Sequence, residues 1–134
     1  MKITSILTVD AIEPSLEFWV GRLGFVKTVE VPDGDKLAFV ILQKGDAELM
    51  FQTHESIAKD AAGTEMANVM KQQTSMLFIE VDDFDDTRKR LGNAEVLVPE
   101  RVTFYGMREI FVKEPGGHVA GFAAKAQDAS AKAV

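Results

Sequence analysis

The chain of 134 residues contains no cysteine, and it has no apolar run long enough to cross a membrane. The lack of cysteine excludes disulfide bonds, thiolate metal sites and cysteine nucleophiles. A membrane-spanning helix needs roughly 20 consecutive apolar residues, and no stretch approaches that length. The first residues, MKITSILTVD, are too short and too polar for a signal peptide. We therefore expect a cytoplasmic protein.

Basic residues are also outnumbered by acidic ones. The chain carries 15 Lys and Arg against 21 Asp and Glu, a net charge of -6. A nucleic-acid-binding surface requires a basic patch, so no such partner is expected. A mild acidic excess mainly favours solubility, and it is compatible with a cationic ligand. The sequence shows no Ser-His-Asp arrangement and no glycine-rich phosphate loop.

What the sequence does contain is an internal repetition. Residues 3–9 read as a strand, and a helix follows that starts near Pro14 and ends at Gly24. Three strands come next: FVKTVEV, KLAFVILQ and AELMFQ. They are separated by the turn sequences PDGD and KGDA. The first half therefore reads strand, helix, strand, strand, strand.

The second half has the same order. SMLFIEV is a strand, and DDFDDTRKRLG is a helix with acidic residues in its first turn and basic ones in its last. AEVLVPERVTFY is a long strand or one broken at Pro99, and REIFVKE and HVAGFAA form a hairpin around PGG. Residues 54–73 connect the halves and are expected to be partly helical.

Two βαβββ repeats predict an α+β fold in which a curved mixed sheet encloses a central cleft. We expect a single domain over residues 1–126. Repeat one covers residues 1–53, the linker 54–73 and repeat two 74–126. Residues 127–134 are small and polar and are expected to form a flexible tail.

Two segments, VDAIEPSLEFWVGRLGF and YGMREIFVKEPGGHVAGF, resemble the vicinal oxygen chelate superfamily. That superfamily includes glyoxalase I, extradiol dioxygenases and bleomycin-resistance proteins. Its metal enzymes take one ligand from each of four strands. The resemblance puts these ligand positions at Thr4, Glu48, Met76 and Gly121. A hydroxyl, one carboxylate, a thioether and a bare backbone are a poor set for a divalent ion. We therefore expect no metal and no cofactor.

Strand alternation indicates which side chains face the cleft. Glu48 faces it together with Met50 and Gln52, and Phe78 faces it from the fifth strand. Tyr105 is expected at the lip, and the orientation of Arg108 stays open. The candidate ligand-binding residues are Glu48, Met50, Gln52, Phe78, Tyr105 and Arg108. The alternatives are that Glu48 faces water, that Met50 and Phe78 belong to the core, and that Tyr105 packs against a dimer partner.

The remaining candidates have simple structural interpretations. Trp19 is expected in the core. His54 is expected in an exposed loop, with a place at the rim of the cleft as the alternative, and His118 is expected at the hairpin corner, where it caps backbone groups. Met66 and Met70 of the linker form either an adaptable lid or the apolar side of a packed helix.

The first hypothesis is a metal-free, homodimeric binding protein similar to the bleomycin-resistance branch. It would sequester a small organic molecule. The alternative is a metal-dependent lyase, epimerase or dioxygenase of the same superfamily. A third possibility is an accessory protein whose cleft has no ligand.

Overall fold

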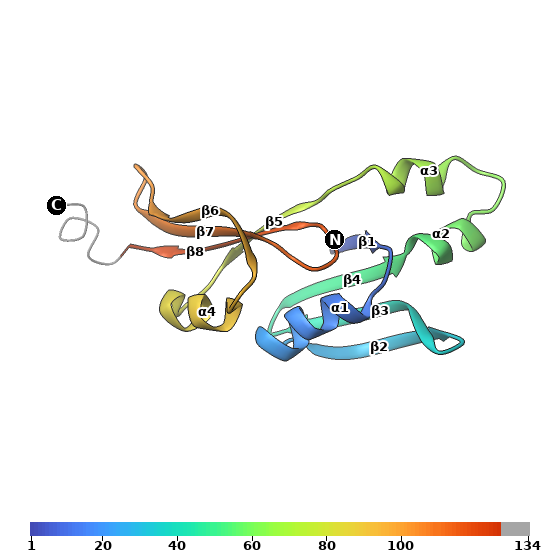
Figure 1. The fold of residues 1–134 in the computed structure, drawn as a ribbon, viewed down its shortest axis with the longest axis horizontal. Helices are drawn as coiled ribbons and strands as arrows, with labels where there is room; N and C mark the ends of the chain where they lie inside the picture. Colours follow the sequence, from blue (N-terminus) through green and yellow to red (C-terminus); the bar gives the residue numbers. More distant parts are fainter. Residues whose placement is uncertain (127–134) are drawn as a thin grey trace. The chain divides into compact units, whose positions relative to one another are not determined.

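The structure is a computed structural model that describes residues 1–126 (Figure 1). Its residues form two compact units, each built on one four-stranded sheet. The first unit comprises Met1–Ser75 with Pro115–Gly117. The second comprises Met76–Glu114 and continues from His118. The tail predicted for residues 127–134 lies outside the described residues.

The first unit contains the strands β1 (Ser5–Val9), β2 (Val26–Asp33), β3 (Lys36–Lys44) and β4 (Ala47–Thr53). Its helices are α1 (Glu13–Leu16), η1 (Glu17–Arg22), α2 (His54–Asp60) and α3 (Met66–Lys71). The strand order is β1-β4-β3-β2. β1 runs parallel to β4, and the other neighbours are antiparallel.

The second unit repeats this plan with β5 (Met76–Glu80), α4 (Phe84–Leu91), β6 (Glu95–Val102), β7 (Met107–Lys113) and β8 (Val119–Lys125). The strand order is β5-β8-β7-β6, again with one parallel pair, β5 with β8. The predicted α+β class and the βαβββ repeat are confirmed. β6 passes through Pro99 without interruption, because shifts in its register with β7 accommodate this residue, which has no N–H to donate.

The core of the first unit lies between one sheet face and the first helix. Leu7, Val40 and Phe51 point from the sheet and are fully buried. Trp19 packs edge-on to Phe25, with ring centroids 5.4 Å apart, and it also contacts Phe51. Trp19 is a core residue, as predicted. The opposite face of this sheet, which we call the open face of sheet 1, carries Ile6, Met50 and Gln52 as partly exposed side chains.

The first helix differs from the predicted α-helix, because residues 17–22 adopt the wider π pitch. Leu23 N donates to Phe18 O at 3.1 Å, a bond that spans five residues. The wider turn brings both Phe18 and Trp19 into the core and leaves Val20 half-buried. A regular α-helical spacing places Val20 on the same face as Leu16, Trp19 and Leu23 and omits Phe18.

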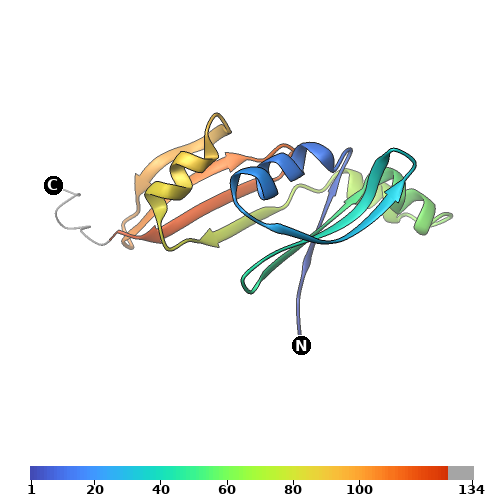
Figure 2. The same cartoon turned by 90° about the horizontal axis from the view of Figure 1, so that it is seen from below.

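In the second unit, α4 lies along one face of the sheet (Figure 2). Phe84 and Leu91 of α4 are buried, as are Ile110 and Phe122 of the sheet. The Asp83 side chain caps the helix by accepting a hydrogen bond from Asp86 N at 3.0 Å. We call the other face of this sheet the open face of sheet 2.

The predicted partly helical linker is confirmed by α2 and α3. Thr53 caps α2, since its hydroxyl accepts from Ser56 N at 3.1 Å. Within residues 1–126, no helix has the length and apolar character needed to cross a membrane.

Candidate functional site

Two of the four family ligand positions lie side by side in the first unit. Glu48 is on β4, and Thr4 immediately precedes β1, which is paired with it. Thr4 Oγ1 donates to Glu48 Oε1 at 3.3 Å, and Lys2 Nζ lies 2.9 Å from the same oxygen. The Glu48 carboxylate is therefore paired with a cation and a hydroxyl of its own chain.

The other two positions lie in the second unit. Met76 is 70% exposed, and Gly121 is paired with Phe78 on β5 and with Phe111 on β7. The Phe111 ring lies across the α-carbon of Gly121. A Cβ at position 121 would be 2.6 Å from Phe111 Cδ2 and closer still to Cε2. The ring occupies the space that a ligand side chain would need.

The residues at the four positions do not fit a divalent metal ion. They offer one carboxylate, already bound by Lys2 and Thr4, and no imidazole. A catalytic zinc site normally has three protein ligands and an open position. Across residues 1–126, no group of three or more His, Asp or Glu side chains is placed to hold a metal ion.

The predicted strand alternation is present on β4. Leu49 and Phe51 are buried against the helices, whereas Glu48, Met50 and Gln52 are partly exposed. Pairing with β1 puts Ile6 beside Met50 and Thr8 beside Gln52. These four side chains form a continuous strip on the open face of sheet 1.

A pocket of about 250 Å³ lies above this strip, within the first unit. Helices α2 and α3 supply the rest of its wall. Thr8 Oγ1 donates to Met70 O at 3.2 Å and so ties α3 to β1. Gln52 Nε2 donates to Ser56 Oγ and to Asp60 Oδ2, both at 3.0 Å. The lining consists of Ile6, Thr8, Gln52, Ile57, Asp60, Ala61, Met66 and Met70.

Of the predicted ligand-binding residues, only Gln52 lines this pocket. The sequence analysis missed Asp60, Ile57 and Ala61, because within residues 54–73 it considered only Met66 and Met70 as possible cover for a ligand. One signal was available: Ser56 and Asp60 are four residues apart in a segment expected to be partly helical, and on a helix such residues lie on one face.

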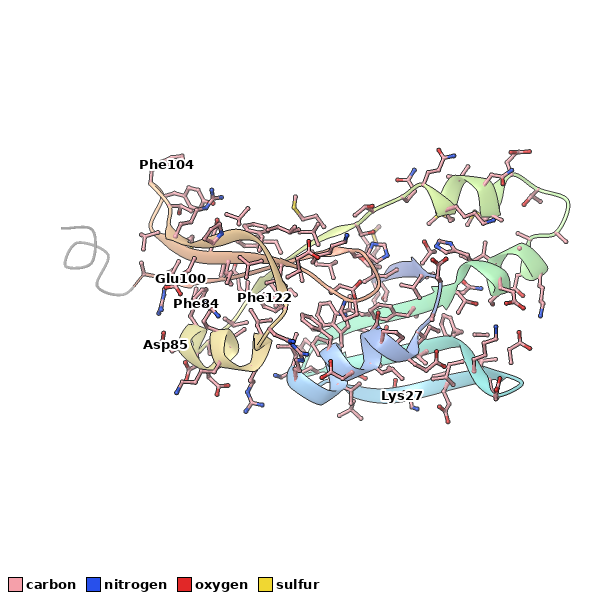
Figure 3. All side chains as sticks on the ribbon, in the orientation of Figure 1. Lys27, Phe84, Asp85, Glu100, Phe104 and Phe122 are labelled. Carbon is pink, nitrogen blue, oxygen red and sulfur yellow. The ribbon has the colours of Figure 1, made fainter. Side chains whose placement is uncertain are left out.

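Arg108 packs inward toward α4. Its guanidinium lies 2.7 Å from Asp85 Oδ1 and 2.8 Å from Glu100 Oε2, and 4.4 Å from the centre of the Phe84 ring. Figure 3 shows Phe84, Asp85 and Glu100 gathered beside α4. The hydrogen bond to Asp85, and then that to Glu100, raise the pKa of Arg108 above its already high value. Arg108 thus ties α4 to β6 and β7.

Phe78 and Tyr105 are both more than half exposed. Phe78 points from β5 onto the open face of sheet 2, and Tyr105 lies in the turn between β6 and β7. Its neighbour Phe104 is fully exposed at the tip of that turn (Figure 3) and packs edge-on against Tyr105, with centroids 5.1 Å apart. Tyr105 Oη donates to Glu109 Oε2 at 2.7 Å, and Arg101 Nη2 lies 3.4 Å from Glu109 Oε1.

The hydrogen bond between Tyr105 and Glu109 gives a testable pH dependence. The Glu109 carboxylate, and secondarily burial, raise the pKa of the Tyr105 phenol above its usual 10.0. Because the folded pKa is raised, the stabilisation is complete below pH 10 and is lost as the pH rises through the folded pKa. Tyr105 is the chain's single tyrosine. We expect its phenolate absorbance to appear at higher pH in the native protein than in urea.

Glu109→Gln should lower the native midpoint of this titration, and Glu95→Gln, at an exposed carboxylate on β6, should leave it unchanged. Identical titrations of native and urea-unfolded protein would contradict the interpretation.

The predicted position is correct for His118 but not for His54. His54 is not in an exposed loop: it begins α2, and its side chain is 18% exposed. Its Nε2 lies 3.8 Å from Asp10 Oδ1, and its buried Nδ1 has no hydrogen-bond partner among residues 1–126. His118 does sit at the hairpin corner. The backbone N–H of His118 donates to Glu114 Oε1 at 3.1 Å, and the backbone carbonyl of His118 accepts from Glu114 N at 2.8 Å.

Comparison with known proteins identifies the fold family. Residues 2–122 match the family described as the Glyoxalase/Bleomycin resistance protein/Dioxygenase superfamily. No curated protein matches the chain.

Solved structures share the fold at low identity. TioX from Micromonospora sp. ML1 has a TM-score of 0.74 at 16% identity and covers 93% of this chain and 98% of its own. Lactoylglutathione lyase from Agrobacterium tumefaciens has a TM-score of 0.72 at 13% identity, with 92% of each chain covered. The bleomycin-binding protein of Streptomyces verticillus, solved with copper(II)-bleomycin, has a TM-score of 0.59 at 24% identity, covering 92% of this chain and 95% of its own. Because the family match extends over residues 2–122, the chain belongs to the Glyoxalase/Bleomycin resistance protein/Dioxygenase superfamily.

Proposed function

We propose that this protein binds a small organic molecule in the pocket on the open face of sheet 1, without a metal ion, and sequesters it. The observation that carries the proposal is the pocket itself. About 250 Å³ of space is bounded by aliphatic and thioether side chains with few polar groups. Such a lining is typical of small-molecule sites in proteins.

The pairing of Glu48 supports binding over metal-assisted chemistry. Lys2 and Thr4 already hold its carboxylate, and Phe111 covers the backbone at Gly121. Fold relatives include a bleomycin-binding protein, so uptake of an organic molecule occurs on this architecture. No described residue is placed as an activated nucleophile beside the pocket.

The site can be tested by blocking the pocket. A compound library is screened by thermal shift, since a ligand that binds the folded state raises Tm. Ile6→Trp should abolish the shift produced by each hit, because the indole would fill the pocket. Val31→Trp is the matched control. Val31 is on the same face of the sheet with 47% exposure against 45% for Ile6, and it does not line the pocket.

A screen without hits would overturn the proposal, as would hits that survive Ile6→Trp. A stoichiometric divalent ion in protein purified without chelator, together with metal-dependent turnover, would favour the enzymatic alternative.

A further inference from the structure

The pocket on sheet 1 has an aliphatic wall. Ile6, Ile57 and Ala61 contribute branched or methyl carbons, and Met66 and Met70 contribute flexible thioether chains. No aromatic side chain is among the lining residues. A ligand cation therefore finds no ring face here, and cation–π contacts do not contribute to its recognition.

The O–H and N–H donors of the neutral polar side chains in the pocket are already used within the chain. The Thr8 hydroxyl donates to Met70 O, and the Gln52 amide nitrogen donates to both Ser56 and Asp60. The lining then presents a single ionisable group, the Asp60 carboxylate.

Asp60 lacks a cation of its own. Within residues 1–126 its side chain makes no ion pair, and its hydrogen-bond donor is the neutral Gln52 amide. The adjacent Lys59 points elsewhere, with Nζ 3.1 Å from Asp33 and 3.5 Å from Glu55. Glu48, the acid on the same face of β4, is paired with Lys2. Asp60 is thus the carboxylate of this site that remains available to a ligand.

We infer that the pocket takes an aliphatic amine, with its ammonium group at Asp60 and its hydrocarbon chain against Ile6, Ile57 and the two methionines. This inference rests on the proposed function and specifies its ligand class. The saturated chain matches the aliphatic wall, and unbranched methionine side chains adjust to chains of different shape. The ammonium supplies up to three N–H donors to a carboxylate that accepts one hydrogen bond from the described residues, from Gln52.

The test compares three probes with the same hydrocarbon chain: n-octylammonium, n-octanol and n-octanoate. Isothermal titration of the wild-type protein should give the order octylammonium, octanol, octanoate, from tightest to weakest. Asp60→Asn keeps the size and the acceptor for Gln52 but removes the charge. It should weaken octylammonium about two- to fivefold, the range of an exposed ion pair, and leave octanol unchanged.

Asp46→Asn is the matched control, because it makes the same change in net charge at an exposed turn residue that does not line the pocket. It should leave all three affinities unchanged. Added salt should weaken octylammonium and not octanol.

Two outcomes would overturn the inference and leave the proposed function standing. In the first, octanol binds as tightly as octylammonium, or Asp60→Asn and Asp46→Asn have equal effects. In the second, library compounds bind in a manner blocked by Ile6→Trp, while none of the three probes binds. If neither the library nor the probes bind, the proposed function fails together with the inference.

Discussion

Replacement of Gly121 by alanine should lower the free energy of unfolding by about 1–3 kcal/mol, the usual cost of overpacking. The new Cβ would lie 2.6 Å from Phe111 Cδ2 and 3.0 Å from Cζ. The backbone at Gly121 is not in the left-handed region, so the cost comes from this contact and not from the main chain. Urea unfolding followed by circular dichroism measures the change.

Two further variants isolate the cause. Gly21→Ala is the matched control, since a Cβ there meets nothing within 4 Å and the residue is helical. It should be neutral or stabilising. In a Phe111→Leu background, Gly121→Ala should cost less than in the wild type, because the smaller side chain can move aside. Equal costs in both backgrounds would show that Phe111 is not the obstacle.

The close approach of the Phe111 ring to Gly121 also affects whether a metal ligand can be placed at position 121. A glutamate at position 121 would meet the Phe111 ring before its carboxylate reached any site. Restoring this one family ligand therefore requires a change on β7 as well as on β8, and Gly121→Glu alone should destabilise the fold without creating metal affinity.

Trp19→Ala should have the largest effect on stability, about 3–5 kcal/mol. Trp19 is fully buried, and its ring contacts Phe18, Phe25 and Phe51, with centroids 5.2, 5.4 and 6.4 Å away. Its removal leaves a cavity where the first helix meets the sheet. The loss would appear as a lower urea midpoint with an unchanged slope.

Trp19→Phe should cost less than Trp19→Ala, because an aromatic ring still fills part of the space. Phe104→Ala provides the exposed counterpart: it deletes an aromatic side chain that is fully accessible, and it should change stability by no more than about 0.5 kcal/mol. A similar loss for Trp19→Ala and Phe104→Ala would contradict the core assignment.

The helices and strands could be predicted wherever the spacing of apolar residues in the sequence matches the face that the folded chain buries. The order of strands and helices followed from apolar spacing, Gly24 and Pro14, and the alternation on β4 followed from the pleat. The π pitch of η1 could not be predicted from local pattern, because it goes with the packing of Phe18 and Trp19 against the sheet.

The candidate site was harder to predict, because its geometry depends on contacts between distant residues. That Gly121 carries no side chain is visible in the sequence. That Phe111 covers it depends on the register of β7 with β8. Lys2 was not considered as a partner for Glu48, and Asp60 reaches the pocket because α2 places it within hydrogen-bond distance of Gln52. Arg108 could not be oriented without the position of α4.

The distribution of two chromophores offers a practical opportunity. The chain has one tryptophan and one tyrosine, and Trp19 belongs to the first unit while Tyr105 belongs to the second. Indole fluorescence and phenolate absorbance therefore report on different halves of an unlabelled sample. Recording both signals along one denaturation series would reveal whether the duplicated halves melt as a single cooperative body or in succession.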